Sequence, residues 1–184
     1  VLGDLVYSVS GKGRIICCDV SSGEIKWEID MEKDIDGFVP YFGISESMAL
    51  DENHVYCYPS GLSNNIVALD RFTGETVWAT PAMQDTSSYC SPIFIDLPER
   101  KIMVTMSQYY LLGIDIDNGK YLWNFKIEGY EAEGDHCNTP VYHDGHIYQT
   151  FGDRKSIGTV KLKLAPDGSS VSEVWYNDRV KNNF

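Results

Sequence analysis

The sequence predicts an all-β fold built from repeated small sheets. Three observations support this prediction. A short motif with aspartate, glycine and tryptophan recurs along the 184 residues, the apolar runs have only the length of strands, and aromatic residues make up 12% of the chain. We find no convincing helical periodicity. We therefore use the repeated motif to locate the expected turns and strands.

The motif is clearest at residues 70–78, which read DRFTGETVW. Residues 19–27 and 115–123 are close copies, and residues 164–175 form a degenerate one. The aspartate side chain can accept hydrogen bonds from backbone N–H groups two residues on, and glycine adopts the left-handed conformation, so each copy predicts a turn between strands. The residues expected to have this structural role are Asp19, Gly23, Trp27, Asp70, Gly74, Trp78, Asp115, Gly119, Trp123, Gly168 and Trp175.

A half-buried strand follows each turn. After the first turn, Ile25, Trp27 and Ile29 alternate with charged residues, which is the period of two that such a strand requires. A buried tryptophan removes roughly 150–250 Å² from water, which contributes about 4–6 kcal/mol before entropy is subtracted. We favour the interpretation that one tryptophan per repeat packs neighbouring repeats together. The alternative is that the tryptophans form a surface on which a ligand stacks.

The spacing of the turns selects the architecture. Intervals of 51, 45 and 49 residues separate Gly23, Gly74, Gly119 and Gly168, and each full interval has room for four short strands. This combination indicates the four-stranded antiparallel blades of a β-propeller, with about four blades present. The expected blade units are residues 1–30, 46–80, 91–127 and 139–177. Because the first unit lacks an opening strand, we expect the chain to be a piece of a larger ring.

Composition excludes some partners. The formal net charge of −12 disfavours nucleic acid and anionic membrane surfaces, which require a basic footprint. There is no apolar run of about 18 residues, so no transmembrane segment is expected. The five cysteines form no C-x-x-C pair, which argues against a disulfide framework or a zinc knuckle. Cys17 and Cys18 are interpreted as small core residues, with a disulfide between the two as the alternative.

A candidate site follows from the propeller prediction. The connection into the first strand of each blade opens at the mouth of the central channel, where a ring of polar residues could bind a small ligand. Function is therefore expected in the irregular connections at 31–47, 81–91 and 128–139. The candidate ligand-binding residues are Tyr41, Glu46, Tyr89, Cys90, His136 and Asn138, with Ser47, Ser91 and Cys137 beside them.

Two weaker hypotheses concern cations. The loop with Glu131, Glu133, Asp135 and His136 could hold a cation or be an ordinary solvated loop. His143 and His146 flank the predicted Asp144-Gly145 turn and could share a metal as cross-strand neighbours. The spacing in the loop follows no known ligand pattern, and two histidines beside a hairpin turn are ordinary and make a poor metal site, so no metal site is assigned. No Ser-His-Asp or Cys-His constellation can be assigned either, and no catalytic residue is predicted.

The motif resembles a known family of repeats. Ala68, Leu69 and Asp70, followed by Thr73, Gly74, Glu75 and Trp78, are similar to the pyrroloquinoline-quinone-like (PQQ-like) β-propeller repeat. That repeat occurs in quinoprotein alcohol dehydrogenases and in outer-membrane assembly lipoproteins of the BamB type. The resemblance spans nearly the whole chain and implies a ring of seven or eight blades and a periplasmic or cell-surface location. The fourth copy departs from the pattern, since Leu164 replaces the aspartate.

The same repeat builds enzymes and scaffolds, so it leaves the activity open. Our leading expectation is a non-catalytic propeller that binds or scaffolds a protein or peptide partner, or a small ligand at the channel, without an evident cofactor. The first alternative is a PQQ-dependent alcohol dehydrogenase that uses PQQ with calcium, part of whose site lies in missing blades. The second is a ligand-sensing or carbohydrate-associated propeller. The residues that a quinone dehydrogenase needs around its calcium and quinone cannot be aligned here.

Overall fold

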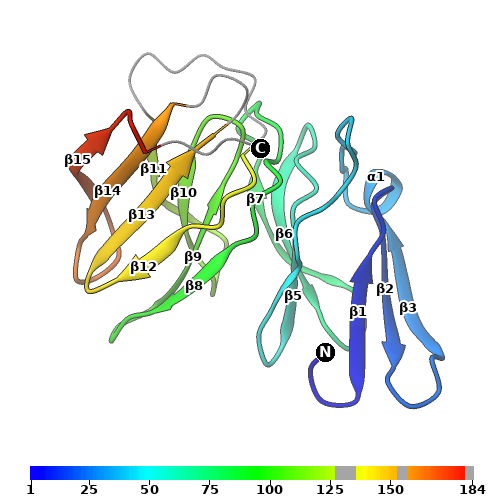
Figure 1. The fold of residues 1–184 in the computed structure, drawn as a ribbon. Helices are drawn as coiled ribbons and strands as arrows, with labels where there is room; N and C mark the ends of the chain where they lie inside the picture. The colour runs from blue at the N-terminus through cyan, green and yellow to red at the C-terminus, as the bar shows by residue number, and fades with distance from the viewer. Residues whose placement is uncertain (127–135, 153–156, 181–184) are drawn as a thin grey trace. The chain divides into compact units, whose positions relative to one another are not determined.

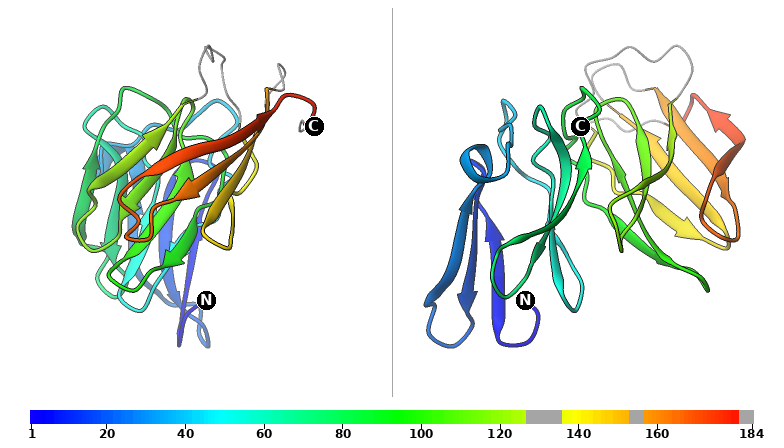
Figure 2. Two further views of the ribbon diagram at one scale, coloured as in Figure 1. Left: turned by 90° about the vertical axis from the view of Figure 1, so that its left-hand side faces the viewer. Right: turned by 180° about the vertical axis from the view of Figure 1, so that it is seen from behind.

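The structure is a computed structural model that describes residues 1–126, 136–152 and 157–180. It confirms the predicted all-β class, with four antiparallel sheets formed by consecutive strands (Figure 1). The chain divides into two compact units, residues 1–87 and 88–184. The further views in Figure 2 show that each sheet is twisted, as isolated blades of this size should be.

Unit 1 contains a three-stranded and a four-stranded sheet, in the orders β1-β2-β3 and β4-β5-β6-β7. A single helical turn, α1 (Met31–Asp34), begins after Asp30, whose side chain accepts a hydrogen bond from the Lys33 N–H. This one turn is too short to have given a periodic signal in the sequence. The strands are β1 (Leu5–Val9), β2 (Arg14–Asp19), β3 (Ile25–Asp30), β4 (Ala49–Leu50), β5 (His54–Cys57), β6 (Asn64–Asp70) and β7 (Thr76–Pro81).

Unit 2 contains two four-stranded sheets, each of which runs in sequence order from its first to its last strand. The first sheet consists of β8 (Ile93–Asp96), β9 (Lys101–Met106), β10 (Leu111–Asp115) and β11 (Tyr121–Phe125). The second consists of β12 (Val141–His143), β13 (His146–Phe151), β14 (Gly158–Leu164) and β15 (Val171–Asn177). In each unit one apolar cluster joins residues of both sheets, so the core of a unit lies between its two sheets.

The repeated aspartate and glycine form the predicted turns. The Asp70 Oδ1 atom accepts hydrogen bonds from the N–H groups of Phe72 (2.8 Å) and Thr73 (2.9 Å), and Gly74 has a φ of +77°. The backbone hydrogen bond from Thr73 is the largest of the contributions that hold the pKa of Asp70 below its usual range. The Asp19 turn has the same arrangement, with Gly23 at a φ of +71°.

The fourth turn differs in its geometry. The Gly168 N–H donates to the Ala165 carbonyl (2.8 Å), three residues back, whereas Gly74 donates to Asp70, four residues back (2.8 Å). Asp167 supplies the side-chain acceptor here, for the Ser169 N–H at 3.1 Å. The missing aspartate at position 164 is therefore replaced by one inside the turn, and Gly168 keeps a left-handed φ of +75°.

Each motif is accompanied by an irregularity in strand pairing that was not predicted from the sequence. The strand before each turn has a register shift one residue after the position that pairs with the repeat tryptophan. This irregularity places the tryptophan at the same position of each sheet. The shifts lie between Cys17 and Cys18, Ala68 and Leu69, Gly113 and Ile114, and Lys161 and Leu162.

Trp27 joins the two sheets of unit 1. Its side chain is 9% exposed, and its Nε1–H donates to the Arg71 carbonyl at 2.9 Å, in the turn of the neighbouring sheet. The ring also lies against Gly74, where an added Cβ would be 2.9 Å from the indole. Tyr7 packs beside the ring at 6.0 Å between centroids, and its hydroxyl donates to the same carbonyl. The tryptophan is thus a packing residue, as predicted.

Trp123 has the same role in unit 2. It is 8% exposed, and its Nε1–H donates to the Gly168 carbonyl at 3.1 Å in the turn of the next sheet. Gly113 leaves room for the ring, because a Cβ there would lie 2.1 Å from the indole. Trp175, in contrast, is 40% exposed and packs beside Tyr148 at 6.3 Å. Trp27 and Trp123 are therefore buried between neighbouring sheets, and Trp175 lies in the last sheet of this sequence.

Candidate functional site

The connection before β4 carries two of the candidate residues, and the structure separates them. Tyr41 is 94% exposed and stacks edge-on against Phe42, with 5.0 Å between ring centroids. Glu46 is only 5% exposed. Two residues of one irregular segment can have opposite exposure, so the sequence could not decide whether Tyr41 or Glu46 belongs to a site.

Backbone contacts hold this connection in place. The Asp36 carboxylate accepts a hydrogen bond from the Ser63 N–H at 2.6 Å, and the Phe38 N–H donates to the Pro59 carbonyl at 2.7 Å. Gly61 permits this contact, because an added Cβ would lie 1.3 Å from the Asp36 carbonyl oxygen. Further along, the Ile44 N–H donates to the Gly11 carbonyl at 3.0 Å. The segment that leads to Glu46 is therefore tied to the rest of unit 1 by hydrogen bonds at Asp36, Phe38 and Ile44.

Glu46 has an incompletely satisfied carboxyl group. Its Oε2 atom accepts a hydrogen bond from the Ser45 N–H at 3.3 Å. Its Oε1 atom is buried and has no hydrogen-bond partner within the part of the chain that the structure describes. Burial raises the pKa of this carboxyl group above its ordinary value. A buried acceptor without a donor is costly, which marks Glu46 as a candidate for ligand contact.

Glu46 also borders open space. A groove of about 300 Å³ runs between β1 and the start of β4 within unit 1. A small void of about 10 Å³ also borders Glu46, among apolar residues that include Cys57. The groove is lined by Val1, Tyr7, Ser8, Val9, Glu46, Ser47, Met48 and Leu50.

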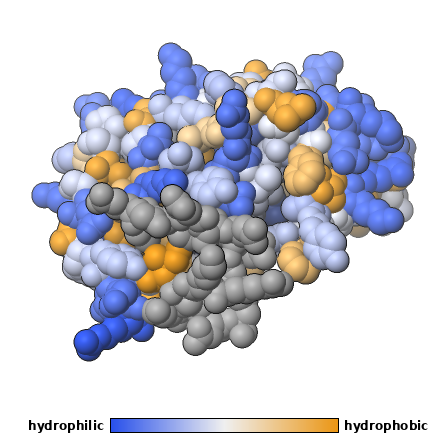
Figure 3. All heavy atoms as spheres, turned by 90° about the horizontal axis from the view of Figure 1, so that it is seen from above, coloured by the Kyte–Doolittle hydropathy of each residue, from blue (hydrophilic) through white to orange (hydrophobic). Residues whose placement is uncertain are grey.

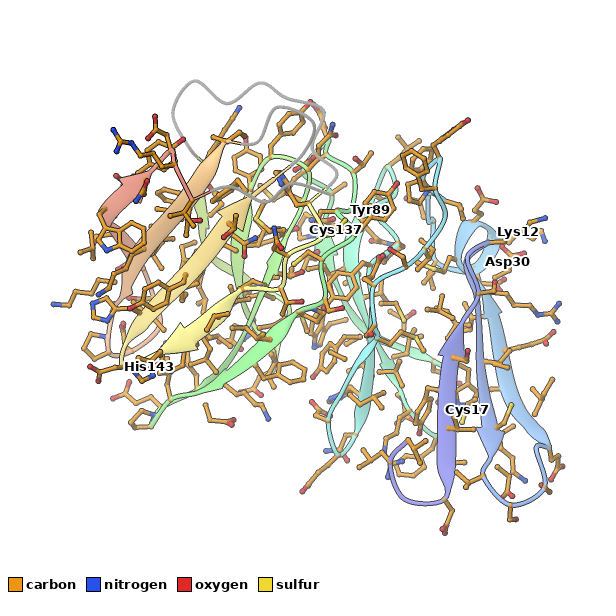
Figure 4. The ribbon with its side chains drawn as sticks, in the orientation of Figure 1. Lys12, Cys17, Asp30, Tyr89, Cys137 and His143 are labelled. Atoms are coloured by element: carbon orange, nitrogen blue, oxygen red, sulfur yellow. The ribbon has the colours of Figure 1, made fainter. Side chains whose placement is uncertain are left out.

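The connection before β8 in unit 2 is largely part of the core. Cys90 is 1% exposed and belongs to the apolar cluster of that unit. Ser88 is also buried and donates to the Met106 carbonyl at 2.8 Å. Figure 4 labels Tyr89, which is partly exposed, on this connection. Cys90 therefore has a packing role, and Tyr89 stays a prediction as a ligand-binding residue.

His136, before β12, is a structural histidine. It is fully buried, with its ring edge-on to Phe151 at 5.6 Å. Its Nδ1 atom accepts a hydrogen bond from the Gly152 N–H at 3.3 Å, so Nε2 carries the proton and donates to the Gln108 carbonyl at 3.1 Å. Both ring nitrogens are thus engaged by the backbone, which argues against the predicted role as a ligand.

Asn138 is engaged in a similar way. Its Nδ2 group donates to the Thr150 carbonyl at 3.3 Å, and its own carbonyl accepts from the Gln149 side chain at 3.0 Å. These bonds fix the connection to β13. Cys137, which lies between His136 and Asn138 in the sequence and is labelled in Figure 4, is exposed. The residues that line the groove at Glu46 all belong to unit 1.

The two hypotheses about cation sites concern residues that the structure describes to different extents. Glu131, Glu133 and Asp135 lie outside the described residues. His143, labelled in Figure 4, pairs directly with His146 as predicted, and the His146 Nδ1 atom contacts the Asp144 carbonyl at 2.6 Å. Within the described ranges, no group of three or more His, Cys, Asp and Glu side chains is arranged to hold a metal ion.

The cysteines of β2 are core residues. Cys17 is fully buried in the apolar cluster of unit 1, and Cys18 is 8% exposed. Successive residues of a strand point to opposite faces, and both thiols are free, so the alternative of a disulfide between them does not hold in this structure.

Sequence reasoning missed a polar cluster at the β4–β5 turn. Asp51 accepts hydrogen bonds from the Asn53 and His54 N–H groups and from the Tyr56 hydroxyl, and its carboxylate contacts His54 Nδ1 at 3.3 Å. Burial raises the pKa of Asp51, but these bonds outweigh it and hold the pKa below the ordinary value. The available signal was the D-x-x-H-x-Y spacing, which places alternate residues of a strand on one face. The cluster ties the turn to the strand.

The fold and its interblade tryptophans define the class of protein as a PQQ-like β-propeller. Residues 1–174 match the family model described as outer membrane protein assembly factor BamB. The chain belongs to that family. Among the described residues, none of the helical structure has the length and apolar character needed to cross a membrane.

Individual relatives agree with this assignment. BamB of Kangiella koreensis is 25% identical over 150 residues, which cover 82% of this chain and 33% of that protein. The crystal structure of BamB from Moraxella catarrhalis superimposes with a TM-score of 0.68 at 18% identity, over 98% of this chain and 51% of that chain. Quinohemoprotein alcohol dehydrogenase from Comamonas testosteroni gives 0.65 at 16% identity, over 98% and 34%. The chain thus spans one third to one half of these relatives, and the structural likenesses show the fold alone.

Proposed function

We propose that this chain is a non-catalytic propeller segment that binds or scaffolds a protein or peptide partner in the periplasm or at the cell surface. The main support for this proposal is that the repeat residues already have structural roles. The aspartates, glycines and two of the tryptophans are engaged in turns and in contacts between sheets. For unit 1, we assign binding to the irregular connection with Glu46, whose Oε1 atom is buried without a partner among the described residues. Membership of a family named for outer membrane protein assembly supports the partner class and the location.

A PQQ-dependent alcohol dehydrogenase is the second candidate, because quinohemoprotein dehydrogenases share the fold. Such an enzyme would hold calcium through carboxylate and amide oxygens beside the quinone. The candidate residues of this chain fit such a calcium site poorly. Glu46 is a single carboxylate, and the Asn138 side chain in the connection before β12 donates through Nδ2 to the Thr150 carbonyl of β13. No calcium or quinone site is therefore assigned to these residues.

Dye-linked alcohol oxidation tests the proposal. The chain, incubated with PQQ and Ca²⁺ and supplied with primary alcohols, is expected to reduce the electron-accepting dye no faster than a sample without protein. A quinoprotein alcohol dehydrogenase in the same assay is the positive control. Saturable turnover above that background would contradict a non-catalytic role, and loss of such turnover in Glu46→Gln would assign it to the groove.

A further inference from the structure

The connection before β4 carries two exposed aromatic side chains at the tip of a tight turn. The Gly43 N–H closes this turn by donating to the Pro40 carbonyl at 2.8 Å, so Tyr41 and Phe42 occupy its two central positions. Tyr41 is 94% exposed and Phe42 is 63% exposed. Central positions of tight turns favour glycine, proline, asparagine, aspartate and serine. Neither burial nor turn chemistry therefore explains the two aromatic residues, whereas contact with a partner would.

A neighbouring turn adds further apolar surface. Leu62 lies in the two-residue loop of the β5–β6 hairpin, which the Gly61 N–H closes by donating to the Asn64 carbonyl at 2.7 Å, and its side chain is 94% exposed. Phe38 is 49% exposed, and its N–H donates to the Pro59 carbonyl beside this hairpin. Both loops lie at the same end of unit 1 in Figures 1 and 2. The exposed apolar patch consists of Phe38, Tyr41, Phe42 and Leu62.

Backbone contacts hold the patch in place before any partner binds. The Asp36 carboxylate accepts a hydrogen bond from the Ser63 N–H at 2.6 Å, which links the two loops that carry the patch. At the end of the aromatic turn, an added Cβ on Gly43 would lie 2.5 Å from the Gly11 carbonyl oxygen, so the turn packs directly on the β1–β2 hairpin. Aromatic side chains on a preorganised backbone lose little conformational entropy on binding, which favours affinity.

The patch lies in the more acidic of the two units. Residues 1–87 contain 14 Asp and Glu against five Lys and Arg, a formal net charge of −9 out of −12 for the chain. Glu32 and Asp34 are exposed on α1, just before the patch, and Lys33 between them is paired with Asp30 at 2.6 Å. Figure 3 views the molecule from this end, where hydrophobic residues lie in small groups beside hydrophilic ones. A partner that covers the patch should therefore carry positive charge next to apolar residues.

The geometry favours a protein partner over a sugar or a lipid surface. The rings of Tyr41 and Phe42 meet at 85°, so they do not form the flat platform on which a sugar ring stacks. The acidic surroundings repel an anionic membrane surface. Turn tips present side chains rather than a strand edge, so a partner must contact them through its own side chains. An amphipathic helix does this with an apolar stripe flanked by polar residues.

We infer that the exposed apolar patch binds a basic amphipathic helix of a partner protein. The apolar face of the helix packs on Tyr41, Phe42 and Leu62, and its Lys or Arg side chains lie near Glu32 and Asp34. Aromatic side chains are frequent hot spots of protein interfaces, and opposite charges at the rim speed association. The inference rests on the proposed binding function and specifies, on the same connection as Glu46, a surface and the chemistry of its partner.

A synthetic helix titrated into the 184-residue protein tests this inference. The probe is the acetylated and amidated peptide LKKLLKLLKKLLKL, whose leucines form one face of a helix and whose lysines flank that face. We expect saturable binding, measured by isothermal calorimetry, with shifts of the backbone amide NMR signals of Tyr41, Phe42 and Leu62. A peptide with glutamate at every lysine position should not bind. Equal binding of the glutamate peptide, or absence of binding at millimolar lysine peptide, would overturn the inference.

Variants separate the patch from general attraction by an acidic protein. The double variant Tyr41→Ser with Phe42→Ser should weaken binding of the lysine peptide at least about tenfold, because two aromatic contacts are lost. The matched control Phe72→Ser removes another exposed aromatic side chain of unit 1, 55% exposed in the β6–β7 turn, and should leave the affinity unchanged. Circular dichroism of both proteins verifies the fold. Equal weakening by the double variant and the control would contradict binding at the patch.

Lipid vesicles and the dye assay distinguish the remaining outcomes. The protein should not sediment with phosphatidylcholine vesicles, which carry no net charge. Sedimentation that the double variant abolishes would overturn the helix partner and assign the patch to a lipid surface. Dye-linked turnover would overturn the proposed non-catalytic function whatever the peptides do. Absence of turnover together with absence of peptide binding would overturn the helix site and leave a binding module whose partner contacts another surface.

Discussion

Replacement of Trp27 by alanine is expected to lower the free energy of unfolding by about 3–5 kcal/mol, as removal of a buried tryptophan does. The indole is 9% exposed, and the substitution would leave a cavity between the two sheets of unit 1. It would also remove the donor to the Arg71 carbonyl. Urea denaturation followed by circular dichroism measures the loss.

Trp175→Ala is the matched control for this prediction. It removes the same side chain from the equivalent position of another sheet, where the indole is 40% exposed and packs chiefly on Tyr148. The expected loss is about 1 kcal/mol, because most of the contacts of a buried anchor are missing there. Equal losses for the two variants would show that the interblade contact of Trp27 contributes little.

Gly61→Ala is expected to destabilise the protein by about 3 kcal/mol or more, because the clash involves backbone atoms that no rotamer change can move. The new Cβ would lie 1.3 Å from the Asp36 carbonyl oxygen, so the connection at 31–47 would have to leave its position. That connection carries Glu46. Amide exchange at Ser63, whose N–H donates to the Asp36 carboxylate, should speed up in the variant.

Gly23→Ala controls for the loss of glycine itself. Gly23 has a φ of +71° but nothing within 4 Å of an added Cβ, so the expected cost is only the backbone strain of about 1–2 kcal/mol. Stability of Gly61→Ala equal to that of Gly23→Ala would contradict the close approach of the two loops.

The fold could be predicted from the sequence because its signals are local. The aspartate and glycine of each motif define a turn through contacts within a few residues, and alternation after the glycine defines the strand. The degenerate copy at 164–175 still forms a turn, since Asp167 supplies the acceptor from a different position. Register shifts beside the tryptophans were not predicted, because they depend on how a strand pairs with both neighbours.

The candidate site was harder to predict because its residues depend on distant partners. His136 is held by the Gln108 carbonyl and the Gly152 N–H, neither of which has a sequence pattern that points to it. Glu46 and Tyr41 lie in one connection with opposite exposure. Sequence alone therefore predicted that function lies in the connections and could not choose among their residues.

Trp27 and Trp123 hold neighbouring sheets together through contacts with the turn of the next sheet. Hydrogen exchange of the indole N–H groups, followed by NMR, tests it most directly. We expect slow exchange for Trp27 and Trp123, whose N–H groups donate to backbone carbonyls of the next sheet, and fast exchange for Trp175, which is 40% exposed. Fast exchange of Trp27 and Trp123, at the rate of Trp175, would contradict it.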